Sequence, residues 1–191
     1  MKTVEVRKGH SENWGLSTGR LHLRRLRPGD GAVLFAYRSE PRVRRFQSMC
    51  PGSVEEAELF VTQQQQTAFD TPETWCQVGI DLQEENKLIG DLGLYFRDEA
   101  SRQVEMGFTI SPAFQRRGFA REAMMAMLGY LFEDVGKHRV ILKMDAENVA
   151  AIALATSLGF RKEAHFVKSY WDRDHWADEV VCAMLRSEWG A

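Results

Sequence analysis

The sequence predicts one α/β (α+β) domain, built on a mixed, mostly antiparallel central sheet of about seven strands with helices on both faces. Stretches of alternating apolar and polar residues indicate strands, and other stretches with apolar residues three and four apart indicate helices. Their order, βααα-βββ-α-β-α-ββ, is typical of a sheet covered on both sides. With 191 residues, of which 44% are hydrophobic and 27% charged, the chain suits a single domain with its own core.

The expected elements follow one another without a repeat or a linker. Residues 1 to about 16 are expected to be a loosely held lead-in before a domain over 17–189. Strands are expected near 20–27, 75–82, 88–97, 102–110, 139–145, 162–170 and 176–186. Helices are expected over about 31–38, around Val43 and Phe46, and over 53–69, 117–134 and 148–158. Residues 98–101 are expected to turn the chain between the third and fourth strands.

Polar residues mark several helix starts. Asp30 follows the turn residues Pro28 and Gly29 and is a candidate N-cap. Ser53 and Glu56 have the spacing of a capping box, and Asn148 is the candidate cap of the helix that Gly159 ends.

Charge and composition exclude several classes of function. A formal net charge of -2 gives no overall attraction to nucleic acid or to an anionic membrane, so neither is a predicted partner. No apolar run approaches the roughly 20 residues of a membrane span, and the polar start does not resemble a signal peptide. Cys50, Cys76 and Cys182 lack metal or redox spacing and are expected to be free thiols, in keeping with a cytoplasmic protein. The five histidines show no ligand spacing, so no metal site is predicted.

The strongest chemical signal is the segment from Gly107 to Ala123, GFTISPAFQRRGFAREA. Pro112 ends a strand, and a basic, glycine-containing loop then opens a helix. Such a junction directs unpaired N–H groups and the positive end of the helix at one point, which favours an anion. By itself the loop is equally compatible with an ordinary strand–turn–helix junction. The P-loop and G-x-G-x-x-G patterns of nucleotide-binding proteins do not occur in it.

The loop and several other segments together resemble the GNAT superfamily of N-acetyltransferases. The segment Gln115-Arg116-Arg117-Gly118-Phe119-Ala120 is similar to that family's Q/R-x-x-G-x-G/A pyrophosphate motif. Other segments resemble the branch of the family that acetylates the N-termini of ribosomal proteins (Rim-type). They are residues 18–24, residues 88–94, Glu105-Met106-Gly107-Phe108, and the spacing from Asn148 to Gly159-Phe160. The resemblance covers roughly residues 17–189.

The resemblance implies acetyl-CoA as cofactor, with coenzyme A as product, held where two strands part. The pantetheine arm would pair with backbone at Phe108, Thr109 and Ile110. The pyrophosphate would bind the loop formed by Gln115, Arg116, Arg117, Gly118, Phe119 and Ala120. Asn148 would reach the cofactor, although it can also act only as a helix cap, and Ala153 and Ser157 would line the other wall.

The resemblance also gives the chemistry. Glu105 is the candidate catalytic base, acting through water, and its alternative role is an ion pair with a nearby arginine. Gly118 is expected to be small so that the pyrophosphate can approach closely. Ala151 and Ala155 stand where relatives carry a serine or a tyrosine, so the usual hydroxyl acid is absent. A thiolate, with a thiol pKa near ~8.5, can leave without one.

The acceptor is the least defined partner. The resemblance favours a protein N-terminal α-amine, and a small-molecule amine such as a polyamine, an antibiotic or an amino-acid derivative is the alternative. The basic segment 38–45 argues against a highly cationic acceptor if it lines the site, but it is also compatible with a solvated surface. A non-catalytic acyl-CoA-binding module is a competing function that the absent hydroxyls favour. Relatives with this domain are often dimers, so the resemblance leaves a homodimer open.

Overall fold

The computed structural model describes residues 5–7, 14–97 and 102–190. In these residues nine strands form one sheet in the order β1-β2-β3-β4-β5-β6-β7-β9-β8. The strands are β1 (Glu5–Arg7), β2 (Gly15–Ser17), β3 (Leu21–Arg25), β4 (Trp75–Leu82), β5 (Lys87–Phe96), β6 (Gln103–Ile110), β7 (Arg139–Asp145), β8 (Arg161–Asp172) and β9 (His175–Leu185). The pair β6–β7 is parallel, and the other neighbouring pairs are antiparallel.

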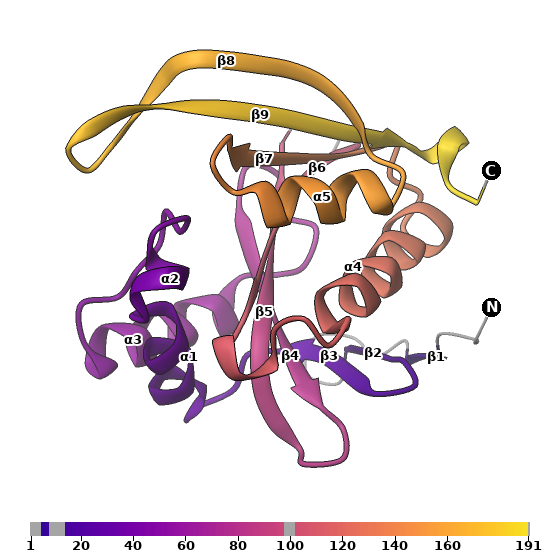
Figure 1. Ribbon diagram of the computed structural model, residues 1–191. Helices are drawn as coiled ribbons and strands as arrows, with labels where there is room; N and C mark the ends of the chain where they lie inside the picture. Colours follow the sequence, from indigo (N-terminus) through magenta and orange to yellow (C-terminus); the bar gives the residue numbers. More distant parts are fainter. Residues whose placement is uncertain (1–4, 8–13, 98–101, 191) are drawn as a thin grey trace.

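Two groups of helices flank the sheet (Figure 1). The first group is α1 (Asp30–Arg38), α2 (Pro41–Arg44) and α3 (Val54–Gln66), and the second is α4 (Phe119–Gly129) and α5 (Val149–Ser157). A π-helical turn, Tyr130–Asp134, continues α4, and short 3-10 turns lie at Pro112–Phe114 and Arg186–Glu188. No helix within the described residues is long and apolar enough to span a membrane. The predicted fold class is confirmed.

The sheet extends further at its N-terminal end than the sequence predicted. The two additional strands, β1 and β2, fall in or next to the expected loose lead-in. Leu16 is fully buried, and the Trp14 ring stacks on Phe69 with 5.3 Å between ring centroids. Residues 14–16 therefore belong to the core. The expected turn at 98–101 lies outside the described residues.

Two of the three predicted helix caps are confirmed. The Ser53 hydroxyl accepts the N–H of Glu56 at 3.2 Å, and the Asn148 side-chain oxygen accepts the N–H of Ala151 at 3.2 Å. The reciprocal half of the capping box is displaced by one residue, because the Glu56 carboxylate accepts from Gly52 N–H instead of from Ser53.

The prediction for Asp30 is wrong. Gly29, with φ of 93°, is the N-cap of α1, and its helix has no side-chain cap. The Asp30 carboxylate instead binds the buried Arg24 guanidinium at 2.7 Å and accepts the N–H of Arg27. A buried guanidinium needs a carboxylate partner more than a helix end needs a cap, since the free helix end can use water.

The core consists of two apolar clusters. The larger one lies between the sheet and helices α4 and α5, and it contains the apolar face of α4 and the turn after it, with Met124, Met127, Leu128 and Leu131. The smaller one packs α1 and α3 against the other face through Leu34, Val61 and their neighbours. Cys76 and Cys182 are buried, Cys50 is partly buried, and all three are free thiols.

A polar network is buried beneath α1. Arg38 reaches the Asp91 carboxylate at 2.6 Å and also donates to the carbonyl of Met49 at 2.9 Å. The hydroxyl of Tyr37 and the amide of Gln77 donate to the same carboxylate. Burial, together with the Asp91 charge, raises the pKa of Tyr37 well above its usual range. The network fixes α1 and the segment after α2 to β5.

Replacing Arg38 by methionine (Arg38→Met) is expected to lower the free energy of unfolding by about 3–5 kcal/mol, because Asp91 is left buried without a cation. Urea denaturation monitored by circular dichroism measures this change. Arg45→Met is the control, because the Arg45–Glu147 pair is exposed (60% and 66%) and removing it should cost about 1 kcal/mol or less. Equal losses in the two variants would contradict the role given to the buried network.

Candidate active site

Strands β6 and β7 part after a short parallel contact. Their pairing covers only Gln103–Glu105 against Arg139–Ile141. Beyond it, β7 stays paired with β9 as far as Asp145, and β6 stays paired with β5 as far as Ile110. The edge of β6 that faces β7 is therefore without a strand partner from Met106 to Ile110 within the described residues. Free strand edges bind extended chains through backbone hydrogen bonds. Of the three residues expected to pair with the cofactor, Phe108 and Ile110 face this edge, whereas the backbone of Thr109 faces Asp91 of β5.

The loop after β6 leaves its backbone donors unpaired. The N–H groups of Phe114 and Gln115 bond to carbonyls of the preceding turn. Those of residues 116–121 bond to no acceptor in the described part of the chain, and α4 has no side-chain cap. Arg116 (φ 59°) and Gly118 (φ 79°) are left-handed on either side of Arg117. Such alternation directs successive N–H groups toward one point and creates an anion-binding concavity.

The structure supplies a conformational reason for Gly118. Only glycine adopts a φ of 79° at little cost. A Cβ added at Gly118 would lie 3.5 Å from the Arg20 guanidinium and would meet no other atom within 4 Å. The backbone conformation therefore explains the glycine at position 118 better than the expected close approach of the ligand does. Helix α4 begins at Phe119, two residues later than predicted, because Gly118 is its N-cap.

The side chains of the loop divide into exposed cations and structural residues. The guanidinium groups of Arg116 and Arg117 make no hydrogen bond or ion pair within the described residues, and Arg117 lies 4.9 Å from the centroid of the Phe119 ring. Phe119 is buried beneath the Arg20 and Arg117 side chains, and Ala120 is partly buried. The Gln115 amide donates to the carbonyl of Ile110 at 2.9 Å and ties the loop to the end of β6.

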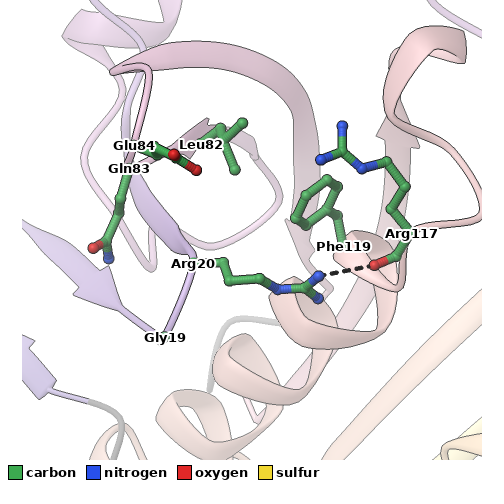
Figure 2. A pocket seen from close by; sticks show the side chains of 7 residues that line it. All are labelled: Gly19, Arg20, Leu82, Gln83, Glu84, Arg117 and Phe119. Carbon is green, nitrogen blue, oxygen red and sulfur yellow. Dashed lines mark hydrogen bonds between the residues drawn. The ribbon is translucent and has the colours of Figure 1, made fainter.

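A cavity of about 450 Å³ lies beside this loop, lined by residues 19–20, 82–84, Arg117 and Phe119 (Figure 2). Arg20, from the turn between β2 and β3, donates to the carbonyl of Arg117 at 3.0 Å on its wall. Arg20 could not be predicted at this position from the sequence, because 97 residues separate the two partners.

Helix α5 forms part of the same region. The Asn148 oxygen caps the helix, and its amide nitrogen makes no hydrogen bond in the described part of the protein. Ala153 and Ser157 lie on the exposed face of the helix. The Ser157 hydroxyl accepts from Arg121 of α4 at 2.9 Å and donates to the carbonyl of Leu154. Ala151 and Ala155 are buried in the core, so no hydroxyl projects from these positions.

Glu105 lies at the point where β6 and β7 part. Its carboxylate is 3.1 Å from the Lys143 ammonium and 3.6 Å from the Arg97 guanidinium, and its side chain is 16% exposed. The expected strand alternation places Gly107 and Thr109 on the same face. A Cβ added at Gly107 would meet open space, so the sheet surface next to Glu105 is uncovered. The ion-pair role and a role in proton removal are compatible in this geometry.

The structure adds Tyr170 and Asp145 to this region. The Tyr170 hydroxyl donates to the Asp145 carboxylate at 2.8 Å, where β7 ends. Partial burial, this hydrogen bond and the nearby carboxylates Asp172 and Glu179 raise the pKa of Tyr170 well above its usual range. Tyr170 therefore holds its proton tightly and is a poor general acid toward a thiolate.

Cations from α2 lie beside the end of β7. Arg45 forms an ion pair with Glu147, in the turn between β7 and α5. Arg173, at the tip of the β8–β9 hairpin, donates to the carbonyl of Arg44. The end of the basic segment is therefore tied to the turn after β7 and to the β8–β9 hairpin, while the side chains of Arg44 and Arg45 remain exposed to solvent. No cluster of three or more potential metal ligands occurs in the described residues.

Comparison with known proteins shows the family to which the chain belongs. Residues 20–161 match the model of the acetyltransferase (GNAT) domain family. The chain is 28% identical to an uncharacterized N-acetyltransferase of Bacillus subtilis, YnaD, over 91% of this chain and 98% of that protein. A GNAT-family acetyltransferase from Bacillus anthracis superposes with a TM-score of 0.82 at 24% identity, covering 91% of this chain and 99% of the other.

Two further solved structures share the fold. One is a putative ribosomal-protein-serine acetyltransferase from Vibrio cholerae, with a TM-score of 0.77, 21% identity, and 92% and 99% of the two chains covered. The other is a spermidine N-acetyltransferase from Vibrio cholerae in complex with CoA and spermine, with a TM-score of 0.77, 23% identity, and 90% and 98% coverage. On these matches the chain belongs to the GNAT family of N-acetyltransferases, enzymes that take their acetyl group from acetyl-CoA.

Proposed function

We propose that this enzyme acetylates the N-terminal α-amine of a protein. The observation that carries the proposal is the excess of cations beside the uncovered sheet next to Glu105: Lys143 and Arg97 share that single carboxylate, and Arg45 lies beside the end of β7, where it pairs with Glu147. These cations oppose a polyamine, which carries several positive charges, more than an acceptor with a single amine.

The proton chemistry supports the same acceptor. At pH 7.5 about a quarter of an α-amine, but only about one in a thousand of a lysine-type amine, is already neutral. An enzyme whose Glu105 is shared with two cations, and which lacks the hydroxyls at Ala151 and Ala155, suits the acceptor that needs less deprotonation. Among the similar proteins, one solved structure is named a ribosomal-protein-serine acetyltransferase and others are spermidine acetyltransferases.

We place the cofactor along the free edge of β6 and on the loop after it. The unpaired N–H groups of residues 116–121 and the guanidinium groups of Arg116 and Arg117 fit a pyrophosphate. The free backbone at Phe108 and Ile110, on either side of the β5-paired Thr109, fits an extended pantetheine arm. The free amide of Asn148 and the exposed face of α5, with Ala153 and Ser157, would contact the same ligand. Bound acetyl-CoA supplies the activated acetyl group.

In this arrangement the chain positions the reactants and manages one proton. The free N–H groups of β6 hold the cofactor in line with the amine, which is where most of the rate gain arises. Glu105 accepts the ammonium proton through water. Tyr170 donates its hydroxyl proton to a hydrogen bond with Asp145 and would not supply one to the leaving sulfur.

We further propose a cytoplasmic homodimer. The edge strand β8 exposes Val167 (72%) and Phe166 (49%), and such an edge can pair with a second copy. The free thiols at Cys76 and Cys182 suit a reducing compartment. Sedimentation equilibrium is expected to give twice the chain mass, and a monomer mass at micromolar concentration would contradict the dimer.

Gly118→Trp is expected to abolish micromolar binding of acetyl-CoA, because the new side chain strains a left-handed residue and displaces Arg20. Titration calorimetry measures the binding, and circular dichroism checks the fold. Gly29→Trp is the matched control, since Gly29 is also a left-handed N-cap glycine (φ 93°) with open space around it. Loss of binding in both variants, or in neither, would contradict the assigned loop.

Glu105→Gln is expected to lower kcat by about 10²–10⁴ while the affinity for acetyl-CoA stays constant, because only proton removal is affected. Stopped assays of CoA thiol release measure the rate. Glu163→Gln serves as the control, because Glu163 of β8 also pairs with two cations, Arg139 of β7 and Arg161 of β8. A kcat within twofold of the wild type would contradict the catalytic role of Glu105 and leave it only a role in ion pairs.

A panel of acceptors tests the proposed substrate. At pH 7.5 a short peptide with a free α-amine is expected to exceed spermidine in kcat/KM by about tenfold or more, because charge repulsion and deprotonation both disfavour the polyamine. An N-acetylated peptide carrying one lysine separates the effect of amine pKa from that of total charge. The double substitution Arg44→Glu, Arg45→Glu should shift the preference toward spermidine. A wild-type preference for spermidine would overturn the protein α-amine.

A further inference from the structure

A clasp made by residues 18–20 holds the first turn of α4. The Thr18 hydroxyl donates to Glu122 at 2.5 Å, and the Arg20 guanidinium binds the same carboxylate at 2.6 and 2.7 Å. The backbone N–H of Arg20 adds a further hydrogen bond at 3.0 Å. Burial raises the pKa of Glu122, but the hydrogen bonds from Thr18 and Arg20 outweigh it and leave the pKa lowered. Glu122 thus stays charged, and the clasp is formed throughout the neutral range.

The clasp also reaches the loop itself. From this fixed position Arg20 donates to the carbonyl of Arg117 at 3.0 Å (Figure 2). Its guanidinium lies 4.5 Å from the centroid of the Phe119 ring, so the side chain is held from two directions. In a planar trans peptide, the C=O of one residue and the N–H of the next point in opposite directions. With the carbonyl of Arg117 directed at Arg20, the N–H of Gly118 is directed away from it.

We propose that Arg20, held by Glu122, is a positioning residue that fixes the Arg117–Gly118 peptide so that the Gly118 N–H serves as a donor to the pyrophosphate of the cofactor. The inference rests on the proposed cofactor site. Without Arg20 the peptide can rotate, because Gly118 is free to adopt many φ angles. Rotation would direct a carbonyl oxygen, instead of an N–H, at the anion. The Glu122 carboxylate in the first turn of α4 would also lose the cation that offsets its charge.

Arg20→Gln tests the proposal by comparing two acetyl donors. The KM for acetyl-CoA and the Kd for CoA are expected to rise by about tenfold or more, the scale of a hydrogen bond to a charged group. The kcat at saturating acetyl-CoA should change little, because a contact made equally in the ground state and transition state affects KM alone. The KM for S-acetylpantetheine, which lacks the pyrophosphate, should be unchanged.

Arg161→Gln is the matched control. Arg161 is 46% exposed and pairs with Glu163 (25%), close to the 48% and 22% of Arg20 and Glu122, but it lies on β8 away from the loop. The Arg161→Gln variant should keep the wild-type KM for acetyl-CoA, Kd for CoA, kcat and KM for S-acetylpantetheine. Arg20→Lys separates orientation from charge, since an ammonium on a flexible stem cannot hold Glu122 and the Arg117 carbonyl in the same fork.

The possible results are distinct. Loss of affinity for CoA in Arg20→Gln and in Arg20→Lys, with unchanged S-acetylpantetheine kinetics, supports the positioning role. Full affinity in Arg20→Lys would show that charge alone matters and overturn it. Equal losses with both donors would show that Arg20 only braces the fold, which also overturns it. Failure of the wild type to bind CoA would instead contradict the cofactor site itself.

Discussion

The structure depends on the separation of two neighbouring strands. The pair β6–β7 is joined over only three residues of each strand, while each strand remains firmly paired on its other side. In an antiparallel hairpin, a tight turn holds the two strands together at one end. Strands β6 and β7 are parallel and connected through α4, so each is fixed by its other neighbour and the two can part. The result is an unpaired strand edge within an otherwise continuous sheet, directly followed by the loop that starts α4.

The two sides of this opening have different chemistry. On the side of α4 and α5, unpaired backbone donors and the cations of Arg116 and Arg117 suit a phosphorylated ligand. On the other side, the sheet surface at Gly107 is open, and Glu105 is shared between Lys143 and Arg97. The proposed clasp of Arg20 on Glu122 connects the early turn of the chain to the first side, and the buried Arg38–Asp91 pair secures α1 near the second.

Features set by neighbouring residues could be predicted from the sequence. The strand Arg139–Asp145, the caps Ser53 and Asn148, and the strand–loop–helix junction at Gly118 all depend on short-range patterns. Asp30 was misassigned because its carboxylate is taken by Arg24, and a sequence pattern does not show which of two local roles a tertiary contact selects. The sequence did not connect Arg20 with the loop or Tyr170 with Asp145 for the same reason. Their partners are 97 and 25 positions away, and periodicity carries no information about such pairs.

The most direct test of the account is the ¹H–¹⁵N spectrum of the labelled protein as CoA is added. In the proposed complex, the backbone N–H groups of residues 116–121 bind the pyrophosphate of the cofactor. Their resonances should therefore shift most and move downfield, because each N–H exchanges water for a charged acceptor, and S-acetylpantetheine should leave them unmoved. Shifts confined to other parts of the chain, or identical shifts with the two ligands, would contradict the claim.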